Sequence, residues 1–228
     1  MTICLVGSEM CIRDRVYVGG NDGMLHGYDA SNGEEIFGYI PNAVVDTLHE
    51  MTDPAFGFGA YVDGLLDLQD AFVDGSWRTL LAGGLRSGGQ GYFMLDVTDP
   101  PSAASDPNDT VLWEFTDQED ADLGYTYGQP VIVKSNYNNG EWVVLVPSGY
   151  NSTESDGTVG TGEAFLYVLA ADDGTLIAKI GVGEGDLVNP NGLSSPVAVS
   201  DTDIQNFGDK SSGTVSYTHL RAHETDRH

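Results

Sequence analysis

Apolar residues along this chain come in short runs that are separated by clusters of Gly, Asn and Asp. Residues 16–40, VYVGGNDGMLHGYDASNGEEIFGYI, contain three such runs, joined at Asn21-Asp22-Gly23 and at Asn32-Gly33. Asn-Gly and Asp-Gly pairs accept the positive φ values of tight hairpin turns. The pattern therefore predicts three antiparallel strands here and an all-β fold for the chain.

The same unit recurs further along the chain. Residues 163–180, EAFLYVLAADDGTLIAKI, place Asp173-Gly174 as Asn32-Gly33 is placed 141 residues earlier. A middle copy over 77–115 contains the runs WRTLLAGGL, GYFMLDVT and VLWEF. The repeat is thus about 70 residues long, measured between matching positions of the three copies. Each later copy also has a preceding strand, expected at 60–73 and 128–135, and 193–200 is expected to open a fourth copy.

A repeat of about 70 residues with four strands is typical of a propeller blade larger than the WD40 unit of about 40 to 45 residues. We therefore predict a partial β-propeller of the quinoprotein-like type, with about three four-stranded antiparallel blades. A β-sandwich with coincidental turns is the alternative, although a sandwich requires no such recurrence. One stretch, 41–59, has apolar residues at helical spacing before an Asp-Pro pair, which predicts a short inserted helix.

The amino-acid composition argues against some classes of binding partner. The chain has 9 Lys+Arg against 35 Asp+Glu and a formal net charge of −26, which argues against nucleic-acid binding because that requires a cationic surface. No apolar run reaches the roughly 18 residues of a membrane span, and we expect none. The acidity fits a cation-rich extracellular setting, or serves solubility alone.

The two ends differ in composition from the rest. Residues 1–15 contain both cysteines, Cys4 and Cys11, and 215–228 contain three of the five histidines. We interpret both ends as artefactual tails from translated sequencing adapters, which leaves 16–214 as the propeller domain. Under this interpretation Cys4 with Cys11, or His219 with His223, is no metal or redox site.

The order of motifs in the body resembles the C-terminal propeller of the PilY/PilC family of type IV pilus assembly and tip proteins. The resemblance covers 16–209 and rests on VYVGGNDGMLHGYDA, YIPNAV, YVDG, WRTLLAGGLRSGGQGYFMLDVTDP, LWEF, LGYTYGQPVIV, GYNS and NGLSSPVAV. Pro147-Ser148, before GYNS, depart from the family's turn sequence. The resemblance implies a secreted protein of the outer membrane, cell surface or pilus tip (fimbrium) that is not an enzyme.

The family resemblance also implies partners and a function. The propeller is expected to work with the pilin and minor pilins in pilus biogenesis, to regulate pilus extension against retraction, and to support adhesion and twitching motility. Adhesion to a host or surface ligand belongs to an N-terminal region that this sequence does not include. We therefore expect the chain to be a fragment, and we assign no adhesive ligand to it.

One stretch has the donors of a calcium site. Residues 201–209, DTDIQNFGD, carry side-chain oxygens at positions 1, 3, 5 and 9, and calcium takes six to eight oxygen ligands. The family carries a calcium loop of this kind at this place, which implies the ligands Asp201, Asp203, Gln205, Phe207 through its carbonyl, and Asp209. Gln205 replaces the usual Asp and removes one charge. The alternative is a solvated acidic turn.

Two other functions remain as alternatives. A pyrroloquinoline-quinone-dependent dehydrogenase uses similar blades, but the body offers only five basic residues and none lies in a recognisable cofactor motif. A non-catalytic outer-membrane assembly scaffold would show no response to calcium. The acidic run at 117–122 is interpreted as a solvated loop, Asp172-Asp173 as a hairpin turn, and His26 and His49 as surface or packing residues.

Overall fold

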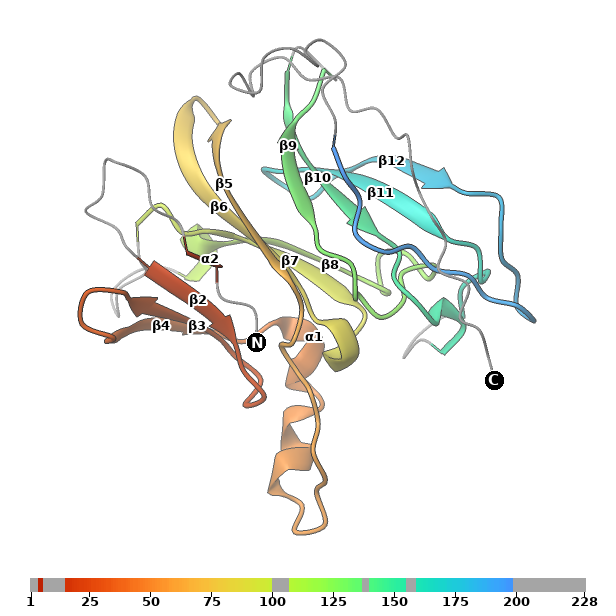
Figure 1. The fold of residues 1–228 in the computed structure, drawn as a ribbon, viewed down its shortest axis with the longest axis horizontal. Helices are drawn as coiled ribbons and strands as arrows, with labels where there is room; N and C mark the ends of the chain where they lie inside the picture. The colour runs from red at the N-terminus through yellow and green to blue at the C-terminus, as the bar shows by residue number, and fades with distance from the viewer. Residues whose placement is uncertain (1–3, 6–14, 100–106, 137–139, 155–158, 199–228) are drawn as a thin grey trace.

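The computed structural model describes residues 4–5, 15–99, 107–136, 140–154 and 159–198, and they form three four-stranded antiparallel sheets (Figure 1). The first sheet contains β1 (Cys4–Leu5), β2 (Arg15–Gly19), β3 (Leu25–Asp29) and β4 (Glu35–Tyr39). The second contains β5 (Leu66–Val73), β6 (Ser76–Gly84), β7 (Gly91–Asp96) and β8 (Val111–Thr116). The third contains β9 (Val131–Lys134), β10 (Trp142–Pro147), β11 (Phe165–Ala170) and β12 (Leu176–Gly181).

Within each sheet the strands follow one another in chain order, so that each is a simple meander. The turns that the sequence predicts are confirmed: Gly23, Gly33 and Gly174 have φ values of +90°, +75° and +71°. These values lie in the left-handed region, which glycine enters without a Cβ clash. The three predicted repeats are therefore three sheets of the same topology.

An irregularity in strand pairing also repeats. In every sheet the register between the third and fourth strands shifts once, at Gly27/Tyr28, at Met94/Leu95 and at Val168/Leu169. A bulge at this position increases the local twist of the outer strand. Its recurrence in all three sheets marks them as copies of one twisted unit.

The sheets stack face to face through apolar side chains. One cluster lies between the first and second sheets, where the rings of Tyr39 and Phe93 meet edge-on at 5.2 Å. Another lies between the second and third sheets, where the rings of Phe115 and Tyr167 are also 5.2 Å apart. Each Å² of apolar surface that this stacking removes from water stabilises the fold by about 25 cal/mol. Burial of these side chains is therefore the main force that joins the blades.

The first strands of neighbouring sheets meet at the inner edge of the stack. Strand β5 contacts both β1 and β9. The Asp67 carboxylate in β5 accepts a hydrogen bond of 2.7 Å from the Ile132 amide in β9, and the Gln129 side chain donates to the Leu66 carbonyl at 2.9 Å. A shared inner edge with sheets fanning outward is the geometry of propeller blades.

The stretch 41–59 forms α1 (Asn42–Val45) and the 3₁₀ helix η1 (Leu48–Thr52) rather than one continuous helix. The predicted helical insertion is thus confirmed in its place and in its shortness. The break falls at Asp46 and Thr47, where the Thr47 hydroxyl donates to the Val44 carbonyl at 2.9 Å. The other short helices in the described ranges are η2 (Arg86–Gly88), α2 (Pro107–Thr110) and η4 (Ser152–Glu154).

The sequence predicts that 193–200 forms the opening strand of a fourth sheet. This prediction is wrong for 193–198, the part of it that the structure describes. Within 193–198 the structure shows only one bridge, between Leu193 and Gly149, and no extended strand. Pro196 has no amide hydrogen to donate to a strand ladder. The segment instead covers the outer face of the third sheet, where Leu193 is buried at 1% exposure.

Candidate functional site

The five predicted calcium ligands, Asp201, Asp203, Gln205, Phe207 and Asp209, lie outside the described residues. The segment that leads towards them is held against the third sheet. The Asn191 amide donates to the Gly162 carbonyl at 2.8 Å, and the Ser195 hydroxyl accepts from the Gln129 amide at 2.8 Å. The approach to the loop is therefore fixed as far as Ser195.

The predicted donor set itself fits a hard cation. Three carboxylates, an amide oxygen and a backbone carbonyl within nine residues are all oxygen ligands, which calcium prefers over nitrogen or sulfur. Across the part of the chain that the structure describes, no group of three or more His, Cys, Asp or Glu side chains is arranged to hold a metal ion. The site at 201–209 stays a prediction from the sequence.

The acidic run at 117–122 is solvated only in part, which corrects the sequence interpretation: Glu119 is exposed, but Asp117 and Asp122 are buried. Asp122 is buried at 7% exposure, and one of its carboxylate oxygens lies 2.6 Å from the Lys179 ammonium. The Asp120 carboxylate lies 2.8 Å from the same ammonium. The Thr161 amide and hydroxyl donate to the other Asp122 oxygen at 2.6 and 2.7 Å. Tertiary contact with β12 draws these two carboxylates out of water.

The charges in this cluster stabilise one another. Burial by itself raises the pKa of Asp122, but the hydrogen bonds from Lys179 and Thr161 outweigh it and hold that pKa below 3.8. Burial likewise lowers the pKa of Lys179, and its bonds to Asp120 and Asp122 more than reverse this and raise it above 10.5. The Lys179 ammonium also lies 4.2 Å from the centre of the Phe165 ring, a cation–π contact. The cluster is a structural clamp between two blades.

His26 takes part in a second charged cluster on the first sheet. Its Nδ1 lies 2.6 Å from a Glu35 carboxylate oxygen, and its Nε2 lies 2.9 Å from an Asp22 carboxylate oxygen. The hydrogen bond to Glu35, aided by that to Asp22, raises the pKa of His26 above 6.5. Glu35 reaches His26 through the pairing of β3 with β4, so the sequence spacing alone carried no signal for it.

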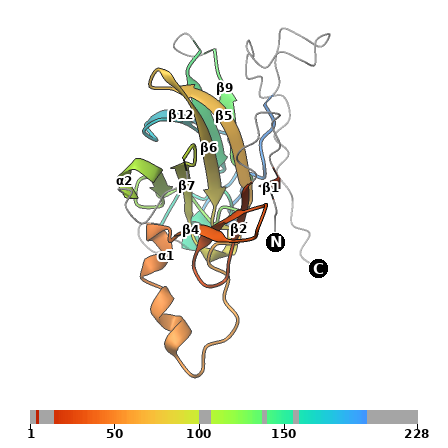
Figure 2. The same ribbon diagram turned by 90° about the vertical axis from the view of Figure 1, so that its left-hand side faces the viewer.

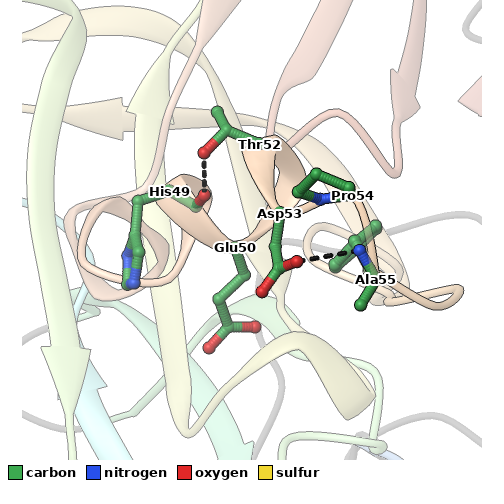
Figure 3. Close-up of a pocket in the computed structure, with 7 residues that line it drawn as sticks. His49, Glu50, Thr52, Asp53, Pro54 and Ala55 are labelled. Carbon is green, nitrogen blue, oxygen red and sulfur yellow. Dashed lines mark hydrogen bonds between the residues drawn. The ribbon is translucent and has the colours of Figure 1, made fainter.

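A pocket lies in the stretch that connects the first two sheets (Figure 3). It is lined by His49, Glu50, Thr52, Asp53, Pro54, Ala55 and Phe56. The His49 ring donates to the Asp46 carbonyl at 2.7 Å, and the Asp53 carboxylate accepts from the Ala55 amide at 2.8 Å. In the close-up the Glu50 and Asp53 side chains extend in the same direction. The sequence pattern did not predict this pocket, although the residues that line it lie within 49–56.

The three meandering sheets, stacked about a shared inner edge, define consecutive blades of a β-propeller. The family model for the PilY1 beta-propeller domain matches residues 4–218. The chain therefore belongs to the PilY1 β-propeller domain family. The predicted fold class and family resemblance are both confirmed.

Two relatives of known name are similar to this chain in sequence. The chain is 42% identical over 185 residues to the type IV pilus biogenesis factor PilY1 of Pseudomonas aeruginosa, a match that covers 80% of this chain and 14% of that protein. It is 42% identical over 198 residues to the PilY1 homolog of Xylella fastidiosa, covering 83% of this chain and 12% of that protein. The chain thus spans only a small part of the length of these relatives.

A solved structure agrees with the fold. The crystal structure of the P. aeruginosa PilY1 C-terminal domain matches this chain with a TM-score of 0.66 and 38% sequence identity. The match covers 90% of this chain and 35% of that one. Residues 4–5, which we placed in the N-terminal tail, pair with β2 and lie within the matched family range. Among the described residues no helix is long and apolar enough to span a membrane.

Proposed function

We propose that this chain forms blades of the propeller of a type IV pilus biogenesis factor that acts at the cell surface or pilus tip. The observation that carries this proposal is the 42% identity over 185 residues to a protein named as such a factor. The agreement in fold with the PilY1 C-terminal domain supports it. The role is one of assembly with the pilin and minor pilins, without catalysis.

A chimera tests this role. Residues 16–214 replace the matching segment of P. aeruginosa PilY1, and the chimera is expressed in cells that lack their own PilY1. We expect surface pili and twitching motility to return to about the level given by the intact P. aeruginosa protein. A chimera that reaches the cell surface in normal amounts and restores neither would contradict the proposal.

We further propose that the loop at 201–209 binds calcium and thereby regulates pilus extension against retraction. The donor set supports this, since its spacing places oxygen-bearing side chains at the first, third, fifth and ninth positions of the loop. Asp201, Asp203 and Asp209 would supply carboxylates, with Gln205 and the Phe207 carbonyl completing the set. With only three carboxylates, we expect weaker binding than in a loop with four.

Calcium binding is measured on the purified C-terminal domain of the chimera. A ligand that binds only the folded state stabilises it by about 2.7 kcal/mol at 100 times its Kd, so the melting temperature should rise with calcium and fall with EDTA. Asp201→Asn with Asp203→Asn should abolish the response. The matched control is Asp172→Asn, in an exposed hairpin turn. An equal response in the loop variant and the control would exclude this loop as the site.

Regulation is measured in cells that carry the same variants. If bound calcium sets the balance of extension and retraction, the Asp201→Asn/Asp203→Asn chimera should change the number of surface pili when retraction is active. The difference should disappear in cells that cannot retract their pili. An unchanged pilus number in retracting cells would refute the regulatory role. Calcium binding itself is tested separately, by the melting experiment.

A further inference from the structure

Between the first and second sheets the chain leaves the stacked blades and returns. We call residues 46–59 the projection, which contains η1 and the turn after it. Figure 2 shows this segment extending away from all three sheets, well clear of both ends of the drawn strands. The projection contributes little to the core at its far end, since 52–58 are all exposed.

The base of the projection is firmly held. Val44 in α1 is fully buried, and the Glu114 carboxylate in β8 accepts hydrogen bonds from the Tyr39 hydroxyl at 2.6 Å and the Asn42 amide at 2.8 Å. On the returning side, Tyr61 is buried at 4% exposure. Both limbs are thus anchored to the blades, so the far end is presented in a defined direction.

The far end carries two exposed aromatic side chains. Phe58 is 87% exposed and Phe56 is 39% exposed. A single exposed apolar residue is common on protein surfaces. Here, however, the two rings lie within three residues of each other at the end of an anchored segment, and Gly57 between them has no heavy atom within 4 Å of where its Cβ would be. Large aromatic residues in such positions are the usual anchors of protein interfaces.

The negative charge of the projection indicates which kind of partner it can bind. Residues 46–59 contain three acidic residues, Asp46, Glu50 and Asp53, and no Lys or Arg. Glu50 and Asp53 line the pocket next to Phe56. An anionic lipid surface would repel these carboxylates, whereas a basic protein surface would attract them. The chemistry therefore points to a protein partner with Lys or Arg beside an apolar recess.

We propose that the projection docks onto another protein of the pilus machinery, with Phe58 entering an apolar recess and a Lys or Arg of the partner entering the pocket at Glu50 and Asp53. This inference rests on the proposed function for its choice of partner. Charge pairing guides the encounter, and burial of the Phe58 ring supplies most of the affinity.

Site-specific cross-linking in cells tests the docking surface. The chimera carries the photo-reactive residue p-benzoyl-phenylalanine in place of Phe58, and a matched version carries it in place of Val188, which is equally exposed at 85%. We expect position 58 to cross-link one pilus protein with a yield at least about tenfold above position 188. The attached peptide should lie on a surface that bears Lys or Arg. Adding Glu50→Lys and Asp53→Lys should lower the yield by about tenfold or more.

Several outcomes would overturn the proposal. They are a yield at position 58 no higher than at 188, a cross-link to lipid or to another segment of the same polypeptide, and an unchanged yield after the charge reversals. Twitching motility of the same chimera separates the two hypotheses. Restored twitching without a specific cross-link would reject the docking hypothesis and leave the proposed function standing. A specific cross-link without restored twitching would count against the proposed function. Phe58→Ser should leave the melting temperature within about 2 °C, because the ring is exposed in the folded chain.

Discussion

The Lys179 ammonium lies 2.6 Å from the Asp122 carboxylate, and this contact ties the outer strand of the third sheet to the loop that follows the second sheet. The two residues are 57 positions apart in the chain. Asp122 is buried, and Lys179 lies over the Phe165 ring, so the pair is shielded from solvent far more than an ordinary surface ion pair. The link acts beside the apolar cluster that joins the same two blades.

Removal of this ammonium should weaken the fold. Lys179→Met leaves Asp120 and Asp122 without their cation, and we expect the free energy of unfolding in urea to fall by about 2 kcal/mol. Lys134→Met is the matched control, because Lys134 makes no ion pair among the described residues, and it should change stability by less than about 0.5 kcal/mol. Equal effects of the two substitutions would show that the clamp adds nothing.

The clamp should also impose an acid limit on stability. The pKa of Asp122 is below its ordinary 3.8 in the folded chain, so its contribution is fully present above pH 3.8 and is lost as the pH falls through the lowered folded value. The stability difference between the natural chain and Lys179→Met should therefore shrink below pH 3.8. Urea unfolding at a series of pH values measures it, and a difference that grows on acidification would contradict the assigned charges.

His26 should titrate above its ordinary value. Its raised pKa means that its contribution to stability is present below pH 6.5 and is lost as the pH rises through the folded value. An NMR titration of the His26 ring should give a pKa above 6.5. Glu35→Gln should lower this pKa more than Asp22→Asn does, because the bond to Glu35 is the largest influence on it. The reverse order would refute the assignment.

Substitutions at two turn glycines of the first sheet distinguish the cost of backbone strain from the cost of a steric clash. Both Gly23 and Gly33 have positive φ, but a Cβ on Gly23 would lie 2.3 Å from a Leu48 methyl group in η1, whereas a Cβ on Gly33 would meet nothing within 4 Å. Gly33→Ala should cost about 1 kcal/mol from strain alone. Gly23→Ala should cost about 1 kcal/mol more and speed hydrogen exchange in η1. Identical costs and unchanged exchange would show that Leu48 does not support the base of the projection.

The calcium loop was predictable only as a set of residue types. Asp, Asp, Gln and Asp at alternate and ninth positions identify oxygen donors, but the sequence does not say which carboxylates converge on one point. The acidic run at 117–122 shows the difficulty: it resembled a solvated turn, and the fold places Asp120 and Asp122 against Lys179. A charge run becomes a clamp or a loop according to what packs on it.

The four-stranded repeat could be predicted from residue order alone, because alternating apolar residues and turns such as Asn32-Gly33 and Asp173-Gly174 are local signals. How the copies meet could be learned only from the fold: which faces stack, which carboxylates lose water, and that 46–59 extends away from the sheets. The two kinds of feature differ in the sequence distance between the residues that interact. Strand and turn formation depend on neighbours a few residues away, whereas the burial of Asp122 depends on a lysine 57 residues later.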